Sequence, residues 1–184
     1  ADSTTNAVYA AADLLSQCEH GADSQGGLFV SDEAKKNEII AEAERQLKLL
    51  PRKEIAEKAF ALSFAVVTDS NEKSIHLTNL WAPEHLIIST DNAEALAEQV
   101  TNAGSVFIGS YACESAGDYA SGTNHTLPTN GAAKAYSGLN MDSFTKKITF
   151  QTISEKGIKT IGHAIEIMAA AEQLDAHKNA VTVR

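Results

Sequence analysis

The chain has 184 residues, of which 43% are apolar and 21% charged, as is usual for a globular protein. Acidic residues outnumber basic ones by 24 to 15, so the formal net charge is −9. This balance, without any cluster of Lys and Arg, argues against a nucleic-acid-binding protein. No apolar run approaches the roughly 18 residues that a membrane helix needs. Two cysteines cannot form a disulfide framework. We therefore expect a cytoplasmic protein without a signal peptide in its first residues and without a membrane partner.

Helices and short apolar strands alternate over residues 1–109. Such alternation is typical of βαβ units, so the sequence predicts an α/β fold with a Rossmann-like parallel sheet and helices on both faces. Cys18 lies on the apolar stripe of the first helix and is expected in the core. The expected helices span residues 7–18, 32–50, 53–62, 71–80 and 91–103, and the expected strands span residues 28–30, 64–68, 85–90 and 105–109.

The alternation stops at residues 109–131, a long stretch of small and polar residues without a period. A loop of this length in a compact domain is usually functional or disordered, and its sparse charge and its aromatic residues favour a functional loop. Beyond it, the pattern predicts a strand over residues 146–153, a long helix that begins after Ser154, and a short helix or tail at the end. We expect a partial α/β domain over residues 1–139 and a strand–helix tail over residues 140–184.

Two pairs of polar residues lie where predicted elements begin or end. Gln17 and His20 share one helix face, so they could bind a metal, or they could be a surface Gln beside a His at a helix end. Glu84 and His85 directly precede a strand. They could supply two bases if the backbone turns at Pro83, or they could be a capping Glu and a partly buried His. The spacing leaves these alternatives open.

Further polar residues occupy the long loop and the C-terminus. The loop contains Glu114, Asp118 and His125, but it matches neither a P-loop nor a dinucleotide-binding fingerprint. Near the C-terminus the group of Glu172, Asp175 and His177, taken alone, is typical of a solvated helix end.

The motifs together resemble the histidinol dehydrogenase family. The matching stretches are SQCEHGADSQ (16–25), APEHLII (82–88), NAGSVFIG (102–109), ESAGDYASGTNHTLPT (114–129) and LDAHKNAVTVR (174–184). They occur in the family's order and correspond to the C-terminal part of its chain. The resemblance implies that the sheet is incomplete without an upstream half, and that L-histidinol is oxidised to L-histidine through L-histidinal with zinc and NAD.

The resemblance also implies roles for particular residues. It implies that Glu84 activates water and that His85 takes the proton of the alcohol. The implied zinc ligands are Gln17, His20, Asp118 and His177, and the implied substrate-binding residues are Gln17, His20, His85, Asp118, His125, Glu172 and His177. The family is a homodimer, so His177 and Glu172 are expected to act in the neighbour's site.

Some features of this sequence depart from the family pattern. The residues that contact NAD are not located in it, so a separate N-terminal half is an expected partner. The alternative is a zinc- and imidazole-binding fragment that is not catalytic without that half. Gly26 and Gly27 stand where bulky strand residues are expected, and Ala132 where an aromatic residue is common.

Overall fold

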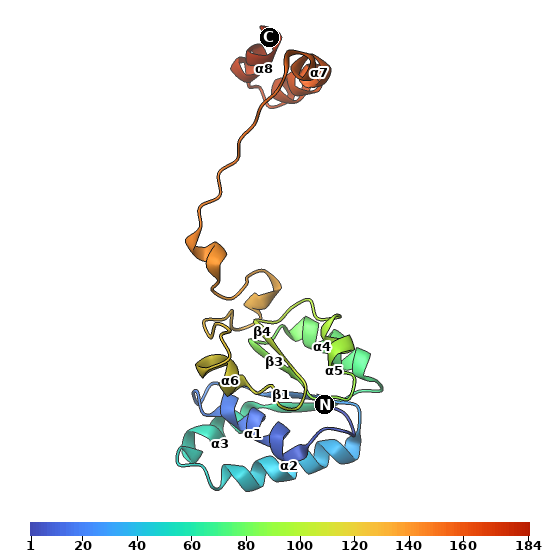
Figure 1. Ribbon diagram of the computed structural model, residues 1–184, viewed down its shortest axis with the longest axis vertical. Coiled ribbons are helices and arrows are strands. Elements are labelled where there is room, and N and C mark those ends of the chain that lie inside the picture. The colour runs from blue at the N-terminus through green and yellow to red at the C-terminus, as the bar shows by residue number, and fades with distance from the viewer. The chain divides into compact units, whose positions relative to one another are not determined.

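A computed structural model describes residues 1–184 and divides them into two compact units, Ala1–Phe144 and Thr145–Arg184 (Figure 1). The helices of the first unit are α1 (Ala7–Cys18), α2 (Glu33–Leu47), α3 (Lys53–Leu62), α4 (Asn71–Trp81), α5 (Ala93–Ala97) and α6 (Glu114–Tyr119), and its strands are β1 (Gly27–Val30), β2 (Phe64–Val67), β3 (His85–Ile88) and β4 (Ser105–Ile108). Two short 3₁₀ turns, η1 (Ala132–Lys134) and η2 (Met141–Phe144), follow.

The four strands form two parallel pairs, β1 with β2 and β3 with β4. The predicted α/β class with parallel strands is confirmed, but the strands do not form one continuous sheet. Each pair has its own packing. Val30 of β1 packs with Ile39 of α2, and Ile88 of β3 packs with Ile75 of α4 and Leu96 of α5.

A separate cluster of buried residues lies where α1, α2 and α3 meet. Cys18 is fully buried in it beside Leu15 and Leu47, as predicted. Small residues of α3, Ala56 and Ala59, let the helices approach closely. This packing fixes the direction of α1. Gln17 lies in the last turn of that helix, and His20 follows just beyond its end.

Gly27 lies against an aromatic cluster that explains its place in a strand. The rings of Phe64 and Trp81 are 5.1 Å apart, and those of Phe29 and Phe64 are 5.6 Å apart. A methyl group on Gly27 would lie 2.7 Å from Trp81 Cζ3 and 2.8 Å from Phe64 Cζ. The large rings occupy the space that a strand side chain would fill.

Three predictions of secondary structure are wrong. Residues 146–153 form no strand, because alternating apolar residues need a neighbouring strand and the second unit has none. The helix expected over residues 91–103 is shortened to α5, and the long loop contains α6. The second unit consists of an extended segment, α7 (Glu155–Ala171) and α8 (Asp175–Thr182), and Ser154 caps α7 as predicted. None of these helices has the length and apolar character required to span a bilayer.

We predict that Gly27→Ala lowers the free energy of unfolding by about 1–3 kcal/mol, because the added methyl group overpacks the aromatic cluster. Gly26→Ala is the matched control. Its methyl group would lie no closer than 3.4 Å to Leu14 Cδ2 and Ser63 Oγ, so its effect should be smaller. Urea unfolding of the two variants measures both values, and equal destabilisation would contradict this account.

Candidate functional site

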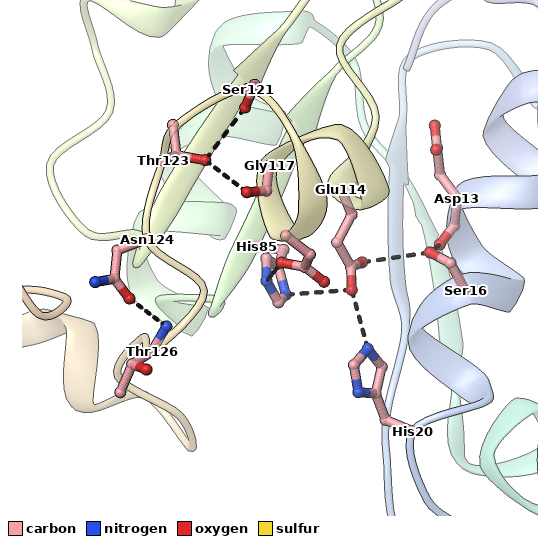
Figure 2. Close-up of polar contacts among 11 residues, drawn as sticks. Asp13, Ser16, His20, His85, Glu114, Gly117, Ser121, Thr123, Asn124 and Thr126 are labelled. Atoms are coloured by element: carbon pink, nitrogen blue, oxygen red, sulfur yellow. Dashed lines mark hydrogen bonds and ion pairs between the residues drawn. The ribbon is translucent and has the colours of Figure 1, made fainter.

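The site is built around Glu114, the first residue of α6, whose side chain is only 4% exposed. One carboxylate oxygen, Oε1, lies 3.1 Å from Nε2 of His20 and 3.8 Å from Nδ1 of His85 (Figure 2). The other, Oε2, accepts a hydrogen bond of 3.3 Å from the hydroxyl of Ser16. The carboxylate therefore connects the end of α1 with the start of β3.

Asp118 adds a second carboxylate one turn further along α6. Its Oδ1 lies 3.9 Å from Nε2 of His85. Ligand atoms of His20, Glu114 and Asp118 all lie within 4.8 Å of one another. Two carboxylates and an imidazole are ligands that suit zinc, so these residues fit a divalent metal ion.

His85 has two buried ring nitrogens that make no hydrogen bond. A buried polar group without a partner costs free energy, and such groups are often functional. The ring is 9% exposed and lies 6.1 Å from the ring of Phe107, so its position is fixed by packing. In the neutral ring one nitrogen carries a proton, and the other is available to a ligand or to a transferred proton.

Glu84 and His85 line the same cavity, of about 910 Å³, together with Gln17, Glu114 and Asp13. The sequence left open whether the backbone turns before Glu84 and His85. The backbone does turn there, because Ala82 ends α4 in the left-handed conformation with φ 59°. The ring of His85 is nearly buried and also lies beside Glu114 and Asp118, so its role as a base stays a prediction.

Burial raises the pKa of two carboxyl groups near this cavity. For Glu84, desolvation raises the pKa, nearby His85 partly offsets this, and Glu114 adds to it. For Asp13, burial and the Glu114 carboxylate raise the pKa to about 6. A carboxyl group with a raised pKa is a stronger base when ionised, as a residue that accepts a proton from water requires.

The structure brings together some of the predicted site residues and not others. His20, His85 and Asp118 lie together, and Gln17 and Glu84 line the adjoining cavity. His125 is exposed in the first unit. Glu172, the C-cap of α7, and His177 of α8 are exposed in the second unit, and their roles stay predictions.

Sequence reasoning noted Glu114 in the loop but gave it no role, and it missed Asp13. The available signal was spacing. Glu114 and Asp118 are four residues apart and share one face of a helix, but that helix was not recognised. Asp13 and Gln17 share a face of α1 in the same way.

The family model of histidinol dehydrogenase matches residues 1–184. Histidinol dehydrogenase of Bacteroides fragilis is 59% identical over the whole chain, and that of Haemophilus influenzae is 50% identical. The crystal structure of histidinol dehydrogenase from Elizabethkingia anophelis superimposes with a TM-score of 0.90 at 57% identity, and the match covers 100% of this chain and 42% of that one. The fold is thus that of an α/β enzyme family, and this chain belongs to the histidinol dehydrogenase family. It spans 43% of the length of these two relatives.

We predict that Glu114→Gln weakens zinc binding at least about tenfold, because it removes a buried charge that holds His20 and faces the metal ligands. Chelator competition measures the affinity. Glu44→Gln, at an exposed position of α2, is the control and should bind zinc like the parent. Unchanged affinity in Glu114→Gln would contradict the placement of the metal.

We predict that Asp13→Asn becomes more stable relative to the parent as the pH rises. The pKa of Asp13 is about 6 in the folded chain against an ordinary value of 3.8, so folding favours its protonated form. Its contribution is fully present below pH 4 and is lost as the pH rises through 6.

The expected gain for Asp13→Asn between pH 4 and pH 7.5 is on the order of 1 kcal/mol, after allowance for solvent screening of a partly exposed group. Urea unfolding in EDTA at the two pH values measures it, with Asp91→Asn at an exposed site as control. A difference between Asp13→Asn and the parent that does not change with pH would contradict the assignment.

Proposed function

We propose that this chain forms the zinc-bearing part of a histidinol dehydrogenase, which oxidises L-histidinol to L-histidine through L-histidinal with NAD. The observation that carries the proposal is the cluster of His20, His85, Glu114 and Asp118 beside the cavity. Membership of the family supplies the substrate and the reaction.

The zinc ligands in this proposal are Gln17, His20 and Asp118, with His177 from a second copy in a homodimer. Ligand atoms of His20 and Asp118 lie within 4.8 Å of each other and of Glu114, and Gln17 lines the adjoining cavity; these observations support the first three ligands. Zinc held by these residues would orient the imidazole and amine nitrogens of histidinol, and NAD would serve as the hydride acceptor. Glu172 is proposed to pair with the substrate amine, and His125 to contact the substrate.

His85 is proposed as the base that takes the hydroxyl proton during the first oxidation. Its nitrogens are buried and unpaired, so one of them can accept a proton without first breaking a hydrogen bond. The imidazolium that forms would lie 3.8 Å from Glu114 and 3.9 Å from Asp118. These carboxylates would stabilise the positive charge.

Glu84 is proposed to activate water for hydration of the aldehyde before the second oxidation. It lines the cavity next to His85, and its raised pKa suits proton abstraction from water. Two neighbouring groups can thus serve two successive proton transfers. The enzyme as a whole is proposed to act in the cytoplasm.

The test is NADH formation from L-histidinol and NAD in the presence of zinc. We expect turnover when the upstream part of the Bacteroides fragilis enzyme is joined ahead of Ala1, because the relatives are more than twice as long as this chain. Zinc binding without NADH formation, even in the joined chain, would support the non-catalytic binding fragment instead.

We predict that Glu84→Gln in the joined chain impairs the conversion of histidinal at least about tenfold more than the first oxidation, because only the second step needs activated water. Rates measured separately from histidinol and from histidinal test this. Glu57→Gln, on the exposed face of α3, is the control. Equal losses in both half-reactions would overturn the role of Glu84.

A further inference from the structure

The face of the β3–β4 pair that carries His85 also carries the ring of Phe107. In the parallel register His85 lies opposite Ser105, and Ile87 lies opposite Phe107. Because side chains alternate between the two faces of a strand, His85 and Phe107 share one face and are diagonal neighbours across the pair. The centroids of their rings are 6.1 Å apart. Phe107 is thus the neighbour in the sheet of the proposed base.

Helix α6 lies against the edge of the Phe107 ring. A Cβ on Gly117 would lie 2.6 Å from Cε1 and 2.9 Å from Cζ of that ring. Gly117 is buried in α6, and Phe107 is only 7% exposed. The hydroxyl of Thr123 donates to the carbonyl of Gly117 at 3.2 Å and holds the end of the helix (Figure 2). Only a glycine lets the backbone of α6 approach the ring this closely.

Gly117 lies on α6 between the two carboxylates of the site. Glu114 precedes it by three residues, and Asp118 follows it directly. Oε1 of Glu114 lies 3.8 Å from Nδ1 of His85, and Oδ1 of Asp118 lies 3.9 Å from Nε2. One ring therefore contacts the helix that carries both carboxylates and lies beside the imidazole that they approach. The size of this ring sets how far apart the helix and the imidazole lie.

The base and the carboxylates are held in different ways. Packing holds His85, because both its ring nitrogens are buried and make no hydrogen bond. Glu114 is held by polar contacts from α1, with the Ser16 hydroxyl at 3.3 Å and Nε2 of His20 at 3.1 Å. The position of His85 therefore depends more on Phe107 than the position of Glu114 does.

We propose that Phe107 is a positioning residue for the reaction and that Gly117 is its counterpart on α6. The ring keeps His85 at the distance from Glu114 and Asp118 at which these carboxylates face the charge that forms when the imidazole takes a proton. The role of His85 as the base rests on the proposed function. The spacing of ring and helix does not.

A swap of side-chain size tests the spacing. Gly117→Ala places a methyl group against the ring, whereas Phe107→Leu lacks the Cε1 and Cζ atoms that this methyl group would meet. We expect Gly117→Ala to weaken zinc binding at least about fivefold in the parent chain but less than about twofold in the Phe107→Leu background. Alanine favours a helix more than glycine does, so loss of α6 would not explain the result. Chelator competition measures the affinities, with Ser115→Ala at an exposed position of α6 as control.

Every outcome of the size swap decides the question. Equal losses of zinc affinity in the two backgrounds would overturn the proposal. If Gly117→Ala alone does not fold, a double variant that folds and binds zinc would support the proposal, and a double variant that also fails would contradict it. Urea unfolding of the same variants in EDTA measures the contact without metal. Coupling in unfolding but not in zinc affinity would mean packing without positioning.

The rate of the first oxidation separates positioning from stability. In the joined chain we expect Phe107→Leu to lower kcat for histidinol at least about fivefold and to change KM less than about twofold, because the base is displaced while Glu114 stays held. Val106→Ala is the control. Val106 lies on the other face of β4 and packs with Ile88, so its truncation should lower stability without lowering kcat.

These results also separate the proposal from the proposed function. Turnover by Phe107→Leu with the kcat of the parent would overturn the positioning role and leave the proposed function intact. Coupling of Gly117→Ala and Phe107→Leu in zinc affinity and in unfolding, without NADH formation by the parent joined chain, would support the spacing and contradict the proposed function.

Discussion

The site depends on one buried carboxylate. Glu114 is almost fully removed from water, and its oxygens contact Ser16 and His20 at the end of α1 and approach His85 at the start of β3. A carboxylate in such a place is costly unless it is paired with positive charge or hydrogen-bond donors. The ring of His20 and the hydroxyl of Ser16 meet part of this need, and a cation at the proposed metal site would meet the rest. The same charge raises the pKa of Asp13 and contributes to that of Glu84, so the whole cavity is biased toward cations and proton acceptance.

This carboxylate also joins two parts of the first unit that otherwise pack separately. α1 belongs to the core around β1, whereas His85 begins β3, which packs with α4 and α5. Distances across the site therefore depend on how the two strand pairs are held together.

Much of the fold could be predicted from the sequence, because strong apolar periods mark α1, α2 and α7 and short apolar runs mark the four strands. The separation of those strands into two pairs could not, since pairing depends on neighbours that periodicity does not report. Residues 146–153 show the same limit, because they alternate like a strand but have no edge to pair with. α6 could not be predicted because its six residues carry no apolar stripe. Without that helix, no role for Glu114 could be predicted either.

The candidate site was predictable only in part. The motifs around Gln17, His20 and Asp118 predicted a metal site because they resemble those of the histidinol dehydrogenase family. The spacing of Gln17 and His20 alone did not decide between a metal site and a surface Gln beside a His at a helix end. The reason for a glycine at position 27 became clear only from the structure, where the rings of Phe64 and Trp81 fill the space of a side chain. Zinc-edge anomalous diffraction from crystals of the joined chain grown with zinc tests the account most directly. The account predicts one strong peak within coordination distance of His20 and Asp118. A peak elsewhere, or none at zinc concentrations that saturate binding, would contradict it.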